Sequence, residues 1–129
     1  MLIVSAARAP QYRDGLQPRP DPSDDELLSQ LAALGGERAA LESALPLLRA
    51  DTRLYRNYRF VPGALLTVPI VAYAGAADPN LRPEDMAGWG ALTRGPFVQR
   101  EFPGGHFYLE DDSAAVLRAL ADDLSSVLD

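Results

Sequence analysis

The pattern of apolar and polar residues along this chain predicts three short strands with helical segments between them. Leu2 to Val4 is a short apolar run, and Val68 to Ala74 is a longer one, rich in β-branched residues, that ends at Gly75. An almost uninterrupted apolar strand is typical of a parallel sheet that is covered on both faces. Phe97 to Phe102 is a third strand, in which successive residues alternate between two faces. The stretch from Pro10 to Pro22 holds four prolines and one glycine and is predicted to be a loop.

The segment between the first two strands is predicted to be helical. Ser23 to Glu26 matches a capping box, and leucines continue at helical spacing until Gly35 ends the first helix. A second helix runs from about Glu37 to Leu45, where Pro46 interrupts it, and a third follows from Leu48 to Tyr58. The leucines of the first helix are Leu27, Leu28, Leu31 and Leu34. These helices form an insertion that contains no strand.

One helix is predicted after each of the last two strands. Pro83 to Leu92 has proline at its first helical position, and Asp112 or Ser113 caps the last helix. One face of that helix is apolar and comprises Val116, Leu117, Leu120, Leu124, Val127 and Leu128. Strands that alternate with helices predict an α/β domain with a parallel sheet. Because such sheets usually have roughly five strands or more, we expect part of the sheet to be missing from this chain.

Length, composition and charge fit a single α/β domain over residues 1–129 with an insertion at about 20–60. The net charge of −6 argues against a nucleic-acid partner. The absence of cysteine excludes disulfides and thiolate metal sites. The longest apolar stretch, Val61 to Ala77, is too interrupted by proline and glycine for a membrane span, and the N-terminus does not match a signal peptide. We therefore expect a cytoplasmic location, with neither a membrane nor a metal ion involved.

Two strand ends carry the residues that suggest chemistry. In parallel sheets, functional residues collect just beyond the carboxyl ends of the strands. Asp78 follows the second strand, and His106, the only histidine, follows the third strand and a Gly-Gly pair. An imidazole takes and returns a proton near neutral pH, and a buried aspartate beside it fixes its tautomer. The alternatives are an Asx turn before Pro79 and a loop histidine that bonds only to its neighbours.

The nucleophile that such a pair serves is absent from the pattern. A Gly-x-Ser-x-Gly elbow is expected before the aspartate and the histidine, and the chain contains none. Ser5 ends a strand but has no flanking glycines, so we do not assign it as the nucleophile. The other serines are predicted to cap helices or to lie within them.

Four segments resemble type II thioesterases, the stand-alone editing hydrolases of polyketide and nonribosomal peptide synthesis. They are Val4–Pro10, Leu48–Asp51, Val68–Asp78 and Phe102–Leu109, and the strings LRAD and FPGGHFYL are the most specific. The resemblance spans essentially all 129 residues. It implies the C-terminal part of an α/β-hydrolase fold, in which three mostly parallel strands have flanking helices and a helical lid insertion.

The resemblance also implies roles for particular segments. Asp78 and His106 correspond to the catalytic aspartate and histidine, and the helices from Ser23 to Tyr58 to the lid over the acyl and phosphopantetheine channel. The first strands, the oxyanion loop and the Gly-His-Ser-x-Gly elbow of the family would lie before residue 1. The chain would then be a truncated or mis-started gene product, or a fragment, that self-associates or binds a complementary N-terminal half.

The function implied is hydrolysis of acyl thioesters on acyl or peptidyl carrier proteins, with no cofactor besides the carrier's own phosphopantetheine. A serine from outside the chain would attack the thioester, with His106 as general base and then acid, and Asp78 to orient it. One alternative is an inactive remnant or subunit that binds a carrier protein or a complementary chain. Another is a different α/β hydrolase, such as an esterase.

Two interpretations stay open for several further residues. Leu27 and Leu31 line the acyl channel or pack on the body of the domain. Phe107 and Tyr108, next to His106, contact substrate or only fill space.

Three arginines fall on one face of the third predicted helix. Arg49, Arg53 and Arg56 are spaced at i, i+4 and i+7. They form either a solvated face that pairs with Asp51 and its neighbours or a docking surface for an acidic carrier protein.

Overall fold

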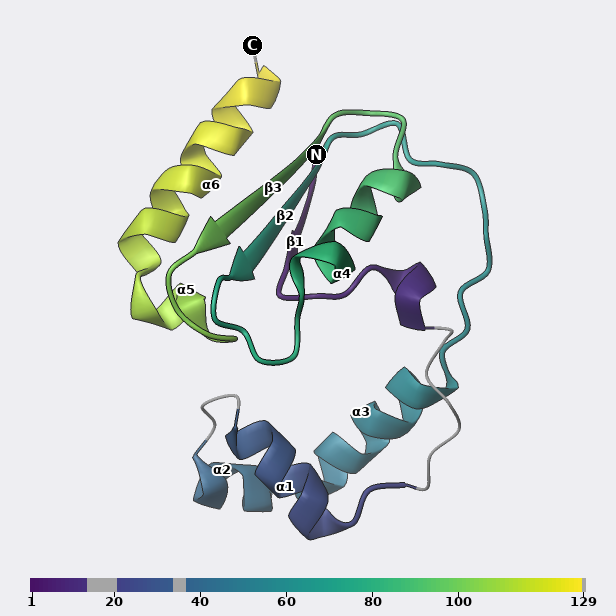
Figure 1. Cartoon of the computed structure of the whole chain (residues 1–129), viewed down its shortest axis with the longest axis vertical. Coiled ribbons are helices and arrows are strands. Elements are labelled where there is room, and N and C mark those ends of the chain that lie inside the picture. Colours follow the sequence, from purple (N-terminus) through teal and green to yellow (C-terminus); the bar gives the residue numbers. More distant parts are fainter. Residues whose placement is uncertain (14–20, 34–36, 129) are drawn as a thin grey trace. The chain divides into compact units, whose positions relative to one another are not determined.

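The computed structural model describes residues 1–13, 21–33 and 37–128, which form two compact units (Figure 1). One unit comprises Met1–Tyr12 and Pro62–Asp129, and the other comprises Arg13–Val61. The first unit contains the sheet, and the second contains three helices.

The sheet consists of β1 (Leu2–Ser5), β2 (Ile70–Gly75) and β3 (Phe97–Phe102) in that order, and both pairs of neighbours are parallel. The prediction of an α/β fold with three parallel strands and flanking helices is therefore confirmed. The second strand starts two residues later than predicted, after Pro69. Because proline has no backbone N–H, it cannot donate to the ladder of a central strand.

The helices of this unit are α4 (Pro83–Ala87), α5 (Tyr108–Asp111) and α6 (Ser113–Leu128). The helix predicted over residues 83–92 is α-helical only in its first half, and Gly88–Leu92 forms a 3₁₀ turn. Two glycines in this second half disfavour the α-helix. Helix α5 was not predicted. The 3₁₀ turn Pro10–Arg13, at the start of the loop predicted over residues 10–22, was not predicted either. Most of that loop lies outside the described residues.

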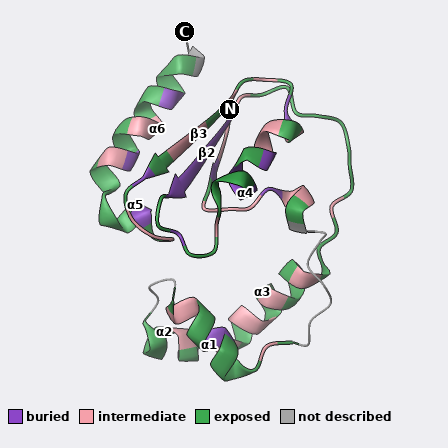
Figure 2. Cartoon of the chain, in the orientation of Figure 1, coloured by how far each residue is buried: buried purple, intermediate pink, exposed green. Residues whose placement is uncertain are grey.

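Both faces of β2 are covered, and every residue of the strand is buried (Figure 2). On one side α4 packs against the sheet, and the buried cluster there contains Val4, Ile70, Ala72, Ala74 and Met86. On the other side α5 and α6 contribute to a cluster of Val71, Tyr73, Phe102, Tyr108 and Val116. The continuous apolar pattern of β2 thus corresponds to a central strand between two layers of helix.

The buried face of α6 differs from the predicted apolar face. Val116 is buried as expected, but Leu117 and Leu124 are 63% and 46% exposed. Asp123 is buried in their place. The side chains predicted for the end of this face, Val127 and Leu128, lie outside the described residues. A charged residue therefore faces the sheet, which a search for apolar periodicity cannot find.

Asp123 is buried because two partners satisfy its carboxylate. Arg100 donates to both carboxylate oxygens, from Nε at 2.8 Å to Oδ2 and from Nη2 to Oδ1, and the Tyr73 hydroxyl donates to Oδ2 at 2.6 Å. The hydrogen bonds from Arg100 hold the pKa of Asp123 below its usual range, against the opposing effect of burial. Burial raises the pKa of Tyr73, so its hydroxyl stays protonated as a donor. This network joins α6 to the middle of β2 and β3.

We expect Asp123→Asn to lower the free energy of unfolding at pH 7 by about 1–2 kcal/mol, because Arg100 loses its charged partner but stays partly hydrated. A depressed carboxyl pKa contributes stability that is present above the unfolded pKa of about 4 and lost as pH falls below it. The difference between the two proteins should therefore shrink below pH about 4. Urea unfolding at pH 7 and at several acidic pH values measures it, and a difference that stays constant with pH would contradict this account.

The second unit consists of α1 (Asp24–Ala32), α2 (Arg38–Ser43) and α3 (Leu45–Asn57). The predicted capping box is present, since Ser23 Oγ accepts from the Glu26 N–H at 3.2 Å and Glu26 accepts from the Ser23 N–H at 2.8 Å. Pro46 does not interrupt a helix, as the sequence analysis predicted it would. It lies in the first turn of α3, where the missing N–H is not needed. The predicted stop at Gly35, and Leu34 before it, lie outside the described residues.

Within the described ranges, no helix is long and apolar enough to cross a membrane.

Candidate active site

Asp78 and His106 lie together beyond the carboxyl ends of β2 and β3. Because these strands are parallel neighbours, the turns that follow them leave the same edge of the sheet. His106 Nδ1 and Asp78 Oδ2 are 2.7 Å apart. The side chain of Asp78 is fully buried, whereas that of His106 is 28% exposed. The two residues that the sequence analysis paired are thus within hydrogen-bonding distance.

The other oxygen of Asp78 is also engaged. Oδ1 accepts a hydrogen bond of 2.9 Å from the backbone N–H of Asn80, which makes the Asx turn that Asp-Pro sequences favour. The turn and the imidazole contact were alternatives in the sequence, and the structure contains both. Since each carboxylate oxygen has its own partner, the plane of the carboxylate is fixed relative to the imidazole.

The turns that carry the pair pack closely against each other. Ala76 N–H donates to the Phe102 carbonyl at 2.8 Å, and Ala77 N–H to the Gly104 carbonyl at 2.9 Å. At Gly75 a Cβ atom would lie 2.0 Å from the Gly105 carbonyl oxygen, so only glycine fits. Gly104 has φ +112°, a backbone conformation that favours glycine. The glycines therefore allow the contact between the two turns as well as the sharp turn itself.

This arrangement can perform acid–base chemistry. Because the carboxylate accepts only, Nδ1 carries the proton in the contact with Asp78, and Nε2 is left as the acceptor. Nε2 has no hydrogen-bond partner among the residues that the structure describes, and the ring is partly exposed. The pair is therefore suited to take a proton from a nucleophile and return it to a leaving group. The described residues contain no cluster of histidine and carboxylate side chains that could hold a metal ion.

The two aromatic residues after His106 have different environments. Phe107 is 42% exposed, and its ring meets the imidazole edge to face, with ring centres 5.2 Å apart. Tyr108 is fully buried and stacks on Phe102 with a centroid distance of 5.3 Å. Its hydroxyl lies 2.6 Å from Ser5 Oγ, and burial raises its pKa. Phe107 thus offers an apolar surface beside the imidazole, whereas Tyr108 packs in the core and holds Ser5.

The leucines proposed for the acyl channel lie in the helical unit. Leu27 is buried and Leu31 is partly buried, both on α1. Leu27 also lines a shallow pocket between α1 and α3, together with Thr52 and Arg53 among others.

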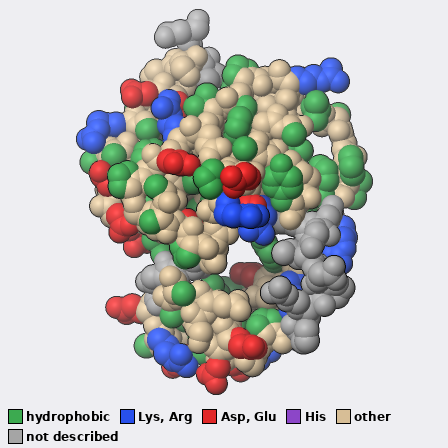
Figure 3. Space-filling model, in the orientation of Figure 1, with side chains coloured by type: hydrophobic (Ala, Val, Ile, Leu, Met, Phe, Trp, Pro, Cys, Tyr) green, Lys and Arg blue, Asp and Glu red, His purple; other side chains and the backbone are tan. Residues whose placement is uncertain are grey.

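The three arginines pair with aspartates near the start of α1 rather than with Asp51. Arg49 Nε donates to Asp24 at 2.6 Å, and Arg56 Nη1 to Asp21 at 3.1 Å. Arg53 lies 3.7 Å from Asp21 and is 67% exposed. Acidic and basic side chains are accordingly interspersed on the face of the helical unit seen in Figure 3. Exposed ion pairs of this kind contribute about 0–1 kcal/mol each, so they add little to the stability of the helical unit.

Sequence patterns gave no indication of several contacts near the site. They comprise the hydrogen bond between Ser5 and Tyr108 and the contacts of Arg8 with Asn80 and Asp85. The only signal was the segment Val4–Pro10, which resembled the thioesterases but had no assigned role.

Comparison with known proteins supports the resemblance over nearly the whole chain. The thioesterase domain family matches residues 1–124. Thioesterase PikA5 of Streptomyces venezuelae is 35% identical over 131 positions, which cover 95% of this chain and 46% of that protein. Thioesterase TesA of Mycobacterium leprae is 33% identical over 128 positions, which cover 94% of this chain and 48% of that protein.

A solved structure gives the same result. The type II thioesterase BorB from the borrelidin biosynthetic cluster superimposes with a TM-score of 0.80 at 34% identity, covering 94% of this chain and 52% of that one. The chain thus spans about half the length of the relatives it matches. The chain belongs to the thioesterase family of the α/β-hydrolase fold, and its relatives include type II thioesterases of polyketide and nonribosomal peptide pathways.

Proposed function

We propose that this chain supplies the acid–base residues of a serine thioesterase that hydrolyses acyl thioesters held on carrier proteins. The observation that carries the proposal is the contact of 2.7 Å between His106 Nδ1 and the buried Asp78 carboxylate. Family membership adds the reaction class, because the relatives are named as thioesterases. The serine would come from residues outside these 129, since they contain no Gly-x-Ser-x-Gly elbow.

The proposed reaction has two halves. In the first, His106 Nε2 takes the proton of the serine hydroxyl while the serine oxygen attacks the thioester carbonyl carbon. The tetrahedral intermediate collapses, the carbon–sulfur bond breaks, and His106 returns the proton to the thiolate of the carrier's phosphopantetheine. In the second half, His106 deprotonates a water that attacks the carbonyl carbon of the acyl-serine ester. The bond between that carbon and the serine oxygen breaks, His106 returns the proton to the serine oxygen, and the acyl group leaves as a carboxylic acid. Asp78 holds the tautomer and stabilises the imidazolium in both halves.

A chimera tests this function. The part of PikA5 that the match does not cover, which would supply the nucleophile, is fused in front of residue 1, and hydrolysis of an acyl-carrier thioester is measured. We expect turnover and labelling of the serine by a fluorophosphonate probe, whereas the 129-residue chain alone is not labelled. A folded, labelled chimera without turnover would favour the carrier-binding subunit. Equal cleavage of simple oxygen esters would favour an esterase.

We further propose that the helical unit, Arg13–Val61, is the lid of this enzyme and carries the carrier-docking surface on α3. Leu27 and Leu31 would contact the acyl chain from the lid, and Phe107 would do so beside the imidazole, with Tyr108 packed behind it. The exposed arginine side chain of Arg53 supports docking, since its contact with Asp21 is 3.7 Å long and solvated. An acidic surface on the carrier protein would be complementary in charge to the arginines of α3.

We expect Arg53→Glu in the chimera to raise KM for carrier-bound thioesters about fivefold, because a cation at the edge of an interface is worth about 1 kcal/mol. KM for a small soluble thioester should not change. Arg38→Glu is the matched control, because Arg38 is an exposed arginine of the same unit that pairs with Glu42 and Asp25 on α2 and α1. Equal effects of both variants on both substrates would contradict a docking surface on α3.

A further inference from the structure

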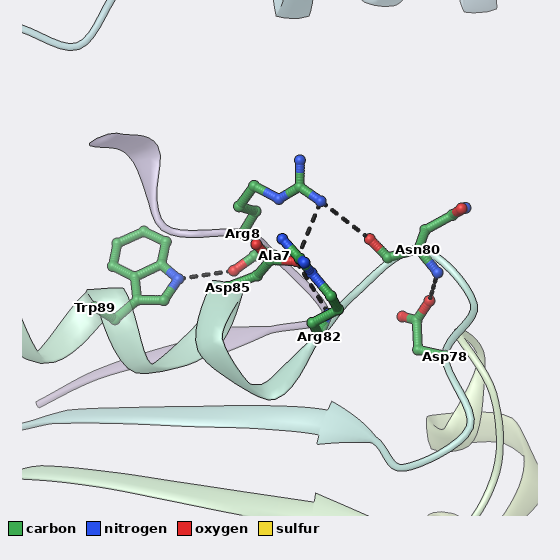
Figure 4. Close-up of polar contacts among 7 residues, drawn as sticks. All are labelled: Ala7, Arg8, Asp78, Asn80, Arg82, Asp85 and Trp89. Carbon is green, nitrogen blue, oxygen red and sulfur yellow. Dashed lines mark hydrogen bonds and ion pairs between the residues drawn. The ribbon is translucent and has the colours of Figure 1, made fainter. Parts of the chain in front are cut away.

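A second polar cluster lies next to the Asp78 turn and is made of residues that the proposed reaction does not use (Figure 4). Arg8 follows β1, and Asp85 lies on α4. The Nη2 atom of Arg8 donates to Asp85 Oδ2 at 3.2 Å. The Asp85 side chain is 6% exposed and that of Arg8 is 25% exposed. This is a largely buried ion pair between two elements that flank the turn.

The same nitrogen of Arg8 also contacts the turn itself. It donates to the backbone carbonyl of Asn80 at 3.4 Å. The backbone N–H of Asn80 donates to Asp78 Oδ1 at 2.9 Å, and Asp78 Oδ2 contacts His106. An uninterrupted series of polar contacts therefore leads from Asp85 through Arg8 and the backbone of Asn80 to the imidazole.

The backbone around Arg8 is fixed on both sides, by α4 and by the 3₁₀ turn Gly88–Leu92 that follows it. Trp89 Nε1 donates to the Ala7 carbonyl at 2.7 Å, and the Ala9 N–H donates to the Asp85 carbonyl at 2.9 Å. The Arg8 side chain therefore extends from a backbone that is held in a defined position, and only side-chain conformational entropy is lost when the guanidinium bridges Asp85 and Asn80.

The Asp85 carboxylate can pair with the positive charge of the Arg8 guanidinium. Burial on its own would raise the pKa of Asp85, but the Arg82 backbone N–H and the Arg8 guanidinium hold it below its usual range. Its carboxylate is therefore charged at neutral pH. The Arg82 side chain is also near, with Nε 3.7 Å from Oδ2, but it is 78% exposed and makes only this contact with the cluster.

We propose that Arg8 is a positioning residue for the Asp78–His106 pair, acting through the backbone of Asn80 and anchored by Asp85. The turn after β2 must present the Asn80 N–H to Asp78 while the carboxylate faces the imidazole. A hydrogen bond from a charged donor to the Asn80 carbonyl restrains the backbone of that residue and so the direction of its N–H. The inference rests on the proposed function for its catalytic consequence, but its structural part does not.

The single histidine makes a direct test possible. Nitrogen-15 NMR of the 129-residue chain reports the tautomer of one imidazole, that of His106. Arg8→Met keeps an unbranched apolar stem, although one shorter by two bonds, and removes every donor. We expect the population of the Nδ1–H tautomer to fall in this variant, because Asp78 is less firmly oriented. In the chimera we expect kcat to fall about tenfold with KM within about twofold.

Arg82→Met is the matched control, since it removes a cation from the same carboxylate without a side-chain contact to Asn80. It should leave the tautomer population and kcat as in the parent. If Arg8→Met lowers only the melting temperature, with the tautomer and kcat unchanged, Arg8 is purely structural and the proposal is wrong. Equal changes in both variants would assign the effect to charge near Asp85 and would also overturn it.

Arg8→Lys tests the positioning role of Arg8 if Arg8→Met does not fold. A lysine nitrogen lies one bond closer to the backbone than Nη2, so it can pair with Asp85 but does not reach Asn80 as well. We expect a reduced Nδ1–H population in this variant, and a parental one would overturn the proposal. The NMR result does not depend on turnover, so a chimera that fails to hydrolyse thioesters would refute the proposed function and leave this inference standing.

Discussion

Replacing His106 by alanine in the chimera should lower kcat for thioester hydrolysis by about 10⁴- to 10⁶-fold. Both halves of the reaction need Nε2, first to deprotonate the serine and then to deprotonate water. The substrate is held elsewhere, so KM should change little. Pre-steady-state kinetics with an acyl-carrier thioester measures both steps, and a variant that keeps more than a tenth of the activity would contradict the assignment.

Asp78→Asn should lower kcat by about 10⁴-fold for a different reason. The amide can present its NH₂ group to Nδ1, which then accepts, and Nε2 is left protonated and unable to act as a base. Because the two residues act as a unit, the double variant should be no slower than His106→Ala alone. A further loss in the double variant would mean that Asp78 acts independently of the imidazole.

The sheet could be predicted because local sequence determines most of it. The buried strand β2 is apolar on both faces, and that property follows from its central place between α4 and α6. The capping box of α1 is likewise local, since Ser23 and Glu26 satisfy each other within one turn. Features that depend on neighbours in sequence were therefore found at or near their observed bounds.

Contacts between distant segments could not be predicted in the same way. The buried face of α6 includes Asp123, whose burial depends on Arg100 and Tyr73 in two different strands. Arg8 acquires its contacts from residues more than seventy positions away. In the sequence, neither Asp123 nor Arg8 can be distinguished from a solvated surface residue, because only the tertiary structure brings their partners near.

The candidate site could be predicted because it depends on the local sequence of two strands and on a general rule for parallel sheets. Parallel strands bring the residues after them to one edge, so a strand followed by Asp78 and the next strand followed by His106 suffice to propose the pair. The Gly-Gly step before His106 lets the backbone turn sharply and approach another group closely. Its partner, Gly75, could not be identified from the sequence, because the contact requires the actual separation of the two turns.

Gly75→Ala should be the most damaging single substitution at the site that leaves every polar group in place. The added methyl carbon would lie 2.0 Å from the Gly105 carbonyl oxygen and 2.8 Å from that of Gly104. Both are backbone atoms, so no side-chain rotation relieves the overlap, and one turn must move away from the other. Overpacking of this kind costs about 3 kcal/mol or more, which corresponds to a fall in Tm of about 10 °C.

The same displacement should also slow the reaction, because Asp78 and His106 lie on the two turns that are pushed apart. A misplacement of about 1 Å can cost about 100-fold in rate, so we expect kcat of the chimera to fall by that order. Gly105→Ala is the matched control for stability, since a Cβ there meets no atom within 4 Å. Thermal unfolding and turnover of both variants measure the two effects. If Gly75→Ala were as stable as Gly105→Ala, the two turns could separate at little cost. The close packing of the turns would then not be what holds Asp78 against His106.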